Sequence, residues 1–268
     1  MANLYIHPDR VQPRFRPFKA WSHMQKLLEN KEDTEQVFHI IEALNGRAQV
    51  SNLANFADSE AGKTLLLRKE YLPPLLDDHA WIRDLPEGTV GRAYIDFMER
   101  EGLSAQGLVD ESEKMRLRRG DVEYDDDLKW YGNRLRDTHD LFHVLTGYGR
   151  DALGEACVLG FTYSQNPGLG VIFIAFMAAR QLNKHLPKEA HIMDCLWEAK
   201  RNGKAASCII REDIIALLHE PLEDARKRLN IARPAAYLHA LKVCADAGIA
   251  ARDIQPSTPM AKDEKVAA

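Results

Sequence analysis

Three side chains that can bind a divalent metal ion occur within five residues of the sequence. His139, Asp140 and His143 form the pattern H-D-x-x-H. In an α-helix, with 100° per residue, His143 lies about 40° and Asp140 about 100° around the axis from His139. All three would therefore share one side of a helix, and histidines at i and i+4 can bind one ion together. The pattern predicts a metal site on this segment.

A second carboxylate, Glu155, follows His143 after a break that contains Gly147 and Gly149. Because a tight turn at these glycines would bring the next helix back beside the first, Glu155 is expected to reach the same ion. Two imidazoles with one or two carboxylates and open coordination positions suit Zn²⁺, and equally Fe²⁺ or Mn²⁺. For H-D-x-x-H alone, ordinary polar groups on a helix are an equally good interpretation, and Glu155 favours the metal. The four predicted metal ligands are His139, Asp140, His143 and Glu155.

Arg136 is a candidate for binding a substrate. It precedes His139 by one turn and lies about 60° from it on the same helical wheel, hence on the metal face. A guanidinium there could hold a substrate carboxylate through two parallel hydrogen bonds. Alternatively, Arg136 only forms an ion pair with Asp140 at i and i+4. The two predicted catalytic residues are Asp140 and Arg136.

The elements that carry these residues are expected to be helices throughout the chain. Alternation typical of strands is scarce, and β-branched residues are diluted by Ala, Leu, Glu, Lys and Arg. The helix with the H-D-x-x-H pattern is expected to begin at the acidic residues 125–127 and to end near Thr146. It is apolar on most of its sides, which is typical of a helix at the centre of a domain.

Capping residues, glycines and prolines delimit the other expected helices. Gly203 is expected to stop one of them, and Pro221 and Pro234 are expected at first helical positions. The expected helices run from 33 to Gly46, from Ser59, over 91–100, from Asp151 to 166, and over 169–182, 188–202, 222–229 and 235–247. We therefore predict an all-α protein, a single compact multi-helix domain with a central metal-bearing helical hairpin.

The composition is typical of a soluble globular protein. The 268 residues carry a formal net charge of −4, and 45 % are hydrophobic and 28 % charged. This mildly acidic balance argues against a nucleic-acid partner, since such binders normally carry a basic excess. The longest nearly apolar run, 168–179, is shorter than the roughly 20 residues of a membrane-spanning helix. The four cysteines are widely spaced, which indicates reduced thiols in the cytosol.

Three segments are expected along the chain: basic and aromatic residues 1–22, a helical domain 23–252, and a disordered tail 253–268. Residues 1–22 contain four Lys or Arg and one Asp, a net charge of +3. Basic residues interleaved with aromatics suit an anionic membrane surface, and a strap over the helical body is an equal alternative. The apolar run 168–179 is expected to be an ordinary buried helix, with the wall of a tunnel for a greasy substrate as the alternative.

The same residues resemble a known family. His139-Asp140-x-x-His143, followed after eleven residues by Glu155, resembles the metal motif of the coenzyme Q biosynthesis protein 4 family. Residues 85–92 resemble the upstream L-P-E-G segment of that family, and residues 202–231 resemble its C-terminal helical region. The resemblance extends over residues 35–232, which is most of the chain.

This resemblance implies an all-helical protein of ubiquinone biosynthesis, with zinc held at the four motif residues. It implies a polyprenylated substrate derived from 4-hydroxybenzoate, whose C1 carboxylate is lost and replaced by a hydroxyl. It also implies a membrane surface and other ubiquinone-biosynthesis enzymes as partners, and a homodimer stays open. Mitochondrial members carry a targeting segment that this N-terminus does not resemble. The expected location is therefore the cytoplasmic face of a bacterial membrane, with the matrix side of the mitochondrial inner membrane as the eukaryotic alternative.

Chemistry leaves the metal and the role of the protein open. Oxidative loss of a carboxylate moves electrons to an oxidant, and Zn²⁺ has no redox chemistry, whereas Fe²⁺ or Mn²⁺ could activate oxygen. The leading hypothesis is an enzyme that performs oxidative decarboxylation of the quinone head group. The alternatives are a non-catalytic lipid-binding scaffold that organises partner enzymes and, ranked third, a helical phosphohydrolase or peptidase.

Overall fold

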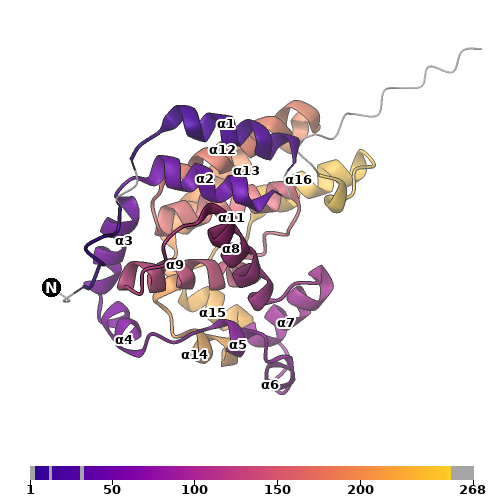
Figure 1. The fold of residues 1–268 in the computed structure, drawn as a ribbon. Coiled ribbons are helices and arrows are strands. Elements are labelled where there is room, and N and C mark those ends of the chain that lie inside the picture. Colours follow the sequence, from indigo (N-terminus) through magenta and orange to yellow (C-terminus); the bar gives the residue numbers. More distant parts are fainter. Residues whose placement is uncertain (1–3, 12–13, 31–32, 255–268) are drawn as a thin grey trace, which may run out of the picture.

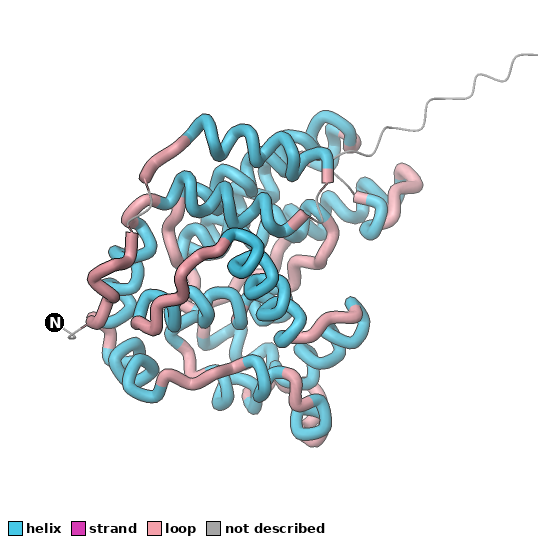
Figure 2. The backbone as a smooth tube through the Cα atoms, in the orientation of Figure 1, coloured by secondary structure: helices cyan, strands magenta, loops and turns pink. Residues whose placement is uncertain are grey.

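The computed structural model describes residues 4–11, 14–30 and 33–254, and every regular element within these ranges is a helix (Figures 1 and 2). The α-helices are α1 (Pro17–Glu29), α2 (Thr34–Asn45), α3 (Ala48–Ala57), α4 (Glu60–Arg68), α5 (Pro73–Leu76), α6 (His79–Arg83), α7 (Val90–Glu101), α8 (Ala105–Arg119), α9 (Asp127–Asp137), α10 (His139–Thr146), α11 (Ala152–Gln165), α12 (Leu169–His185), α13 (Ile192–Ala205), α14 (Ile214–His219), α15 (Leu222–Arg228) and α16 (Ala235–Asp246). Three short 3₁₀ helices are η1 (Lys188–Ala190), η2 (Ile209–Arg211) and η3 (Ala251–Asp253). The predicted all-α fold is confirmed.

α11 lies at the centre of the helical body. It packs against α12 and α13, and α13 in turn contacts α16. α10, which carries the H-D-x-x-H pattern, contacts α7, α11 and α15. One continuous hydrophobic core contains buried residues from α3 to α16, together with Ile254, which fits a single domain. The predicted metal-ligating segment is therefore enclosed by helices from both halves of the chain.

Local signals explain several of the helix ends. The side chain of Ser59 accepts a hydrogen bond from the Gly62 amide at 3.0 Å, and Asp126 accepts one from Lys129 at 2.9 Å. These side chains satisfy amides that have no partner within the helix. Gly147 ends α10 with a φ of 78°, in the left-handed region that favours glycine. The starts predicted at Ser59 and at residues 125–127 are confirmed.

The helix predicted from 125–127 to Thr146 is interrupted in the structure. α9 ends at Asp137 and α10 begins at His139, with Thr138 between them. The Thr138 hydroxyl is buried and donates a hydrogen bond to the Arg134 carbonyl at 2.8 Å. Back-bonding of this kind by threonine bends helices. The interruption falls directly before His139, the first predicted ligand.

Gly203 does not stop a helix. α13 continues to Ala205, and a Cβ atom on Gly203 would lie 2.3 Å from the Phe161 carbonyl oxygen of α11. The glycine therefore allows two helix backbones to approach closely. Pro221 and Pro234 were also misplaced by one residue, since each precedes its helix as the N-cap. The range 188–202 was predicted as one helix. The structure has two elements there, the 3₁₀ helix η1 and α13.

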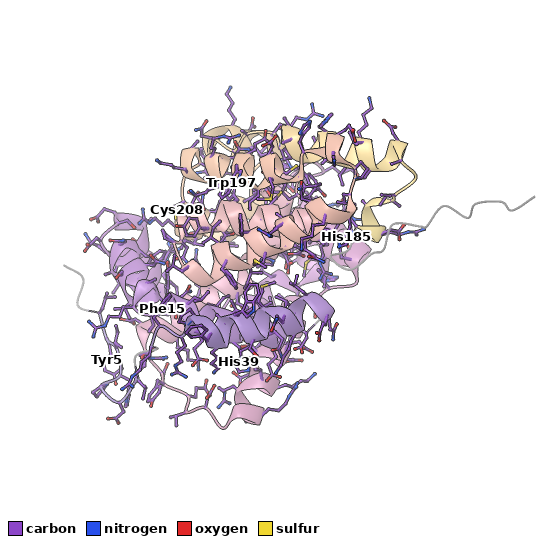
Figure 3. All side chains as sticks on the ribbon, turned by 90° about the horizontal axis from the view of Figure 1, so that it is seen from above. Tyr5, Phe15, His39, His185, Trp197 and Cys208 are labelled. Atoms are coloured by element: carbon purple, nitrogen blue, oxygen red, sulfur yellow. The ribbon has the colours of Figure 1, made fainter. Side chains whose placement is uncertain are left out.

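The N-terminal segment forms both a strap and a helix. The backbone of Tyr5 donates to the Asp127 carboxylate at 2.8 Å, and Arg10 pairs with Asp126 at 2.7 Å, so residues 4–10 lie on the start of α9. α1 contacts α2 and α12, and its buried residues form a second, smaller apolar cluster with them. The boundary predicted between residues 22 and 23 thus falls inside α1. The side chain of Phe15, just before α1, is labelled in Figure 3.

The first two residues of the predicted disordered tail, 253–268, belong to the folded domain. Of the predicted tail, Asp253 closes η3 and Ile254 is fully buried, with its carbonyl accepting a hydrogen bond from the Ala152 amide at 3.3 Å. The rest of that tail, residues 255–268, lies outside the described residues. All four cysteines are free thiols. Among the described residues, none of the helices combines the length and apolar character that a membrane crossing requires.

Candidate metal centre

The candidate centre is built on two consecutive helices. α10 ends at Gly147, and α11 begins after Asp151, whose carboxylate accepts hydrogen bonds from the Leu153 and Gly154 amides at 3.1 and 3.0 Å. The two helices contact each other. A cap that fixes the first turn of α11 also fixes Glu155, which lies in that turn.

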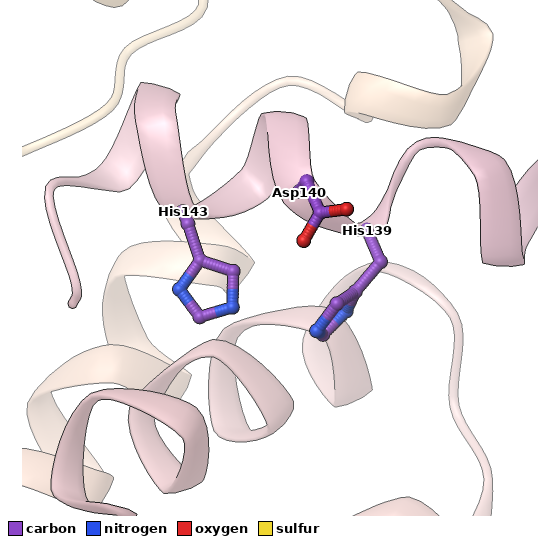
Figure 4. A group of neighbouring side chains, drawn as sticks. All are labelled: His139, Asp140 and His143. Carbon is purple, nitrogen blue, oxygen red and sulfur yellow. The ribbon is translucent and has the colours of Figure 1, made fainter. Parts of the chain in front are cut away.

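Three of the predicted ligands lie together on α10 (Figure 4). The metal-ligating atoms of His139, Asp140 and His143 all lie within 4.8 Å of one another. The spacing in the sequence explains this cluster, because residues at i, i+1 and i+4 of one helix share a side. The two imidazole rings are 5.1 Å apart and nearly perpendicular.

Glu155 reaches this cluster from α11. Its Oε2 atom lies 3.6 Å from His139 Nε2 and 3.4 Å from His143 Nε2. The structure therefore brings the second carboxylate to both imidazoles, across the glycine break. The His143 side chain is fully buried, whereas 31 % of the His139 side chain and 34 % of the Glu155 side chain are exposed. Access from solvent is therefore on the His139 and Glu155 side.

The orientation of the His143 ring is fixed by the backbone that follows it. Nδ1 lies 3.0 Å from the Tyr148 carbonyl oxygen. Because a carbonyl only accepts, Nδ1 must carry a proton and donate, so in the neutral ring the lone pair is on Nε2. Phe97 of α7 stacks on the ring at 5.4 Å between centroids. This arrangement points one imidazole lone pair at the Glu155 carboxylate.

The residues present fit a bound cation. His143 Nε2 is buried and has no hydrogen-bond partner among the described residues. A lone pair 3.4 Å from a carboxylate oxygen is unfavourable, because both atoms are acceptors. A positive charge between them, a proton or a metal ion, removes the conflict. Two imidazoles and two carboxylates form a donor set for Zn²⁺, Fe²⁺ or Mn²⁺.

Electrostatics keep Glu155 ionised. Burial raises the pKa of this carboxyl, but the neighbouring His139 and His143 outweigh burial and hold the pKa well below its ordinary value of 4.5. For His139, burial lowers the pKa, and the Glu155 and Asp140 carboxylates outweigh it and raise the pKa above 6.5. The carboxylate is therefore in the charged form that binds cations.

Arg136 does not form the ion pair with Asp140 that the helical spacing offered as an alternative. Within the described part of the chain its guanidinium pairs with Asp137 Oδ1, at 2.8 Å from both Nε and a terminal nitrogen, and not with Asp140. The interruption at Thr138 separates Arg136 from α10. Its catalytic role stays a prediction, and so does that of Asp140.

Sequence reasoning missed three contributors to the centre. Tyr148 acts through its backbone carbonyl, which no side-chain pattern reveals. Phe97 lies in a distant helix, so its stacking depends on the tertiary fold. Arg150 lies in the turn before α11, with its Nε atom 3.6 Å from Glu155 Oε1. Its position five residues before a predicted ligand was the one available signal.

Comparisons with known proteins identify the family and agree with this fold. The sequence model described as coenzyme Q (ubiquinone) biosynthesis protein Coq4 matches residues 20–235. The mitochondrial ubiquinone biosynthesis protein COQ4 of Ajellomyces capsulatus is 28 % identical over 177 residues, which are 65 % of this chain and 58 % of that protein. The mitochondrial COQ4 homolog of Danio rerio is also 28 % identical, over 183 residues, which are 65 % and 60 % of the two chains.

The chain thus spans less than two thirds of the length of either relative. A crystal structure of a Nostoc punctiforme protein assigned to ubiquinone biosynthesis has the same fold. It has a TM-score of 0.61 and 20 % identity, and the match covers 81 % of this chain and 99 % of that one. Because the family's sequence model matches most of the chain, this protein belongs to the coenzyme Q (ubiquinone) biosynthesis protein Coq4 family.

Proposed function

We propose that this protein catalyses the oxidative decarboxylation of a polyprenylated intermediate derived from 4-hydroxybenzoate, in ubiquinone biosynthesis. The C1 carboxylate of the ring would leave as CO₂ and a hydroxyl would take its place. The observation that carries the proposal is the buried Nε2 atom of His143, which has no hydrogen-bond partner among the described residues and lies 3.4 Å from Glu155 Oε2. Family membership supports the pathway, and this cluster supports a metal-dependent reaction.

Different residues at the centre would bind the metal ion, orient its ligands and receive the substrate. His139, Asp140, His143 and Glu155 would hold the metal ion, with the Tyr148 carbonyl keeping the His143 lone pair in place. A bound divalent ion would act as a Lewis acid toward the substrate, and Fe²⁺ or Mn²⁺ would add the redox chemistry that Zn²⁺ lacks. The exposed sides of His139 and Glu155 would receive the aromatic head group.

The reaction requires an oxidant. Written as a half-reaction, ArCO₂⁻ and H₂O give ArOH, CO₂, a proton and two electrons. The C–C bond to the carboxylate breaks and a C–O bond forms. Dioxygen is the class of oxidant that we assign, and reduction by two electrons with two protons converts it to H₂O₂.

Activity with a defined substrate tests the proposal. The purified chain, loaded in turn with Zn²⁺, Fe²⁺ or Mn²⁺, is given dioxygen and a short-chain prenylated 4-hydroxybenzoate labelled at the carboxylate. Release of labelled CO₂ with formation of the hydroxylated ring is expected with at least one metal. His143→Ala should abolish the release, and His79→Ala, a partly exposed histidine paired with Glu99, should not.

Other outcomes separate the alternatives. If no metal supports CO₂ release while His143→Ala lowers the melting temperature and releases metal, the ion is structural. The protein would then be a lipid-binding scaffold that organises the other enzymes. If CO₂ release is unaffected by His143→Ala, the centre proposed here is not the site of reaction.

A further inference from the structure

A cavity of about 510 Å³ lies at the C-terminal end of α10, where that helix meets the segment from α15 to α16. Leu145, Thr146 and Gly147 line one side of it, and residues 223–238 line the other. None of the four predicted metal ligands is among its lining residues. We call it the α10–α15–α16 cavity.

More basic than acidic residues line the cavity. Three are cations, Arg226, Lys227 and Arg233, and one is an acid, Glu223, which leaves a surplus of two positive charges. Arg226 has a structural role. It donates to the Leu145 and Val144 carbonyls at the end of α10, both at 2.9 Å, and pairs with Glu223 at 2.6 Å.

Lys227 and Arg233 are the surplus charges. Both are exposed, and neither has a carboxylate within ion-pair distance among the described residues. Two like charges that line one small cavity repel each other, and a bound anion would relieve that repulsion. Lys227 belongs to helix α15, and Arg233 lies in the loop before α16. Both side chains are long, so they can approach one anion from two different elements.

Apolar side chains make up most of the remaining lining. Leu145 is fully buried, Pro234 is buried, and Ile231 and Leu238 are half-buried. The volume of the cavity is within the range of small-molecule sites. A ligand that fits this combination has a negatively charged head group and a short apolar body.

We propose that the α10–α15–α16 cavity is a binding site for a small amphiphilic anion, whose phosphate or carboxylate head lies between Lys227 and Arg233 and whose apolar part contacts Ile231 and Leu238. A soluble ester and a lipid head group would present the same chemistry. The site differs from the metal centre in its lining, because none of the four predicted metal ligands lines the cavity.

Titration of the full chain with octyl phosphate, below its micelle concentration, tests the proposal. Calorimetry gives the affinity, and amide NMR shifts locate the ligand. We expect shifts at Gly147 and Leu238, and at least about tenfold weaker binding of octanol and of inorganic phosphate, since each lacks one half of the recognition. Vesicles that contain phosphatidic acid show whether a lipid head group also binds.

Paired variants make the test specific. Lys227→Gln with Arg233→Gln should weaken octyl phosphate binding at least about tenfold, because two charged hydrogen-bond donors are lost. Arg180→Gln with Lys242→Gln removes the same net charge from exposed positions outside the cavity and should leave the affinity unchanged. All four positions are on the surface, so the variants should fold.

Three results would overturn the assignment. Binding that survives the Lys227 and Arg233 substitutions shows that these residues do not form the site. Equal losses in both paired variants show attraction by overall charge alone. Binding that is lost on His139→Ala with His143→Ala, but kept without the two cations, places the anion at the metal centre.

Discussion

At the scale of single residues, His143 shows how a backbone atom prepares a side chain for a metal. The Tyr148 carbonyl holds Nδ1 at 3.0 Å, and the stacked Phe97 limits rotation of the ring. The nitrogen that would bind the ion is thus oriented before the ion arrives. Outer-shell contacts of this kind commonly change metal affinity by about 10–100-fold when they are removed.

Arg150, rather than Arg136, is expected to bind the substrate carboxylate. The Arg150 side chain is 36 % exposed beside Glu155, whereas the guanidinium of Arg136 is 11 % exposed and already paired with Asp137. Arg150→Gln should raise KM about tenfold and leave kcat almost unchanged, because it removes binding that the ground and transition states share. Steady-state kinetics of labelled CO₂ release measure both constants.

Arg136→Gln is the matched comparison. It leaves the buried Asp137 carboxylate without its partner, so the free energy of unfolding should fall by about 3–5 kcal/mol with KM unchanged. Denaturant unfolding measures that loss. If Arg136→Gln instead raises KM and Arg150→Gln does not, the substrate carboxylate binds at Arg136, as the helical wheel predicted.

At the scale of elements, the turn between α10 and α11 must bring two backbones together. A Cβ atom on Gly154 would lie 2.0 Å from the Gly149 carbonyl oxygen. Gly154→Ala should therefore displace the first turn of α11, and Glu155 with it, and lower the free energy of unfolding by about 3 kcal/mol. Metal affinity, measured by competition with a chelator, should fall as well.

Gly107→Ala is the control for this change. Gly107 lies in α8, and its added Cβ atom would meet only the Ser104 hydroxyl, at 3.0 Å. A side chain can shift where a backbone cannot, so stability and metal affinity should stay within experimental error. Equal effects of the two substitutions would show that the close approach at Gly149 does not position Glu155.

The start of α9 gives a prediction about pH. Burial raises the pKa of Asp126, but hydrogen bonds from Arg10, His7 and Lys129 outweigh it and hold the pKa below its ordinary value of 3.8. A group whose pKa is lowered by folding stabilises the protein above its unfolded value, and that stability is lost as the pH falls through the folded value. Asp126→Asn should lower the free energy of unfolding by about 1–3 kcal/mol at pH 7.

The difference between the wild type and Asp126→Asn should shrink below pH 3.8, where the wild-type carboxylate takes up its proton. Unfolding in denaturant at several pH values measures this. Cleavage by trypsin near Arg10 should become faster in the variant, because the strap over α9 loses its anchor. A constant difference across the acid range would show that Asp126 does not stabilise the fold through its charge.

The elements also show what sequence could predict. Caps such as Ser59 and Asp126 act within a few residues, so the helix starts that they define were predictable. The H-D-x-x-H cluster was predictable for the same reason, since helical spacing alone brings it together. Gly203 was misread because a glycine that ends a helix and one that admits a neighbouring backbone look alike in sequence. The helix is interrupted at Thr138 between Arg136 and Asp140, and no glycine or proline in the sequence marks that interruption.

At the scale of the whole molecule, α1 presents an apolar and basic surface outward. Ala20, Met24 and Leu27 fix the inner face of α1 on α2 and α12. Phe15, Phe18 and Trp21 are 59 %, 90 % and 48 % exposed. Arg14 and Arg16 are exposed beside them. Exposed aromatics with basic neighbours are suited to an anionic lipid surface, where a substrate with a polyprenyl tail would be found.

Cosedimentation with vesicles tests this surface. Phe15→Ala with Phe18→Ala should weaken binding to vesicles of anionic lipid at least about tenfold, because two aromatic side chains no longer enter the interface. Leu67→Ala with Leu117→Ala changes side chains that are 88 % and 67 % exposed on α4 and α8, and it should not alter binding. These substitutions are sharper than removal of residues 1–21, which would cut α1.

Binding should also weaken as salt screens the basic side chains. Equal binding by the wild type and the Phe15 and Phe18 variant would exclude α1 as the membrane surface and leave it a structural helix.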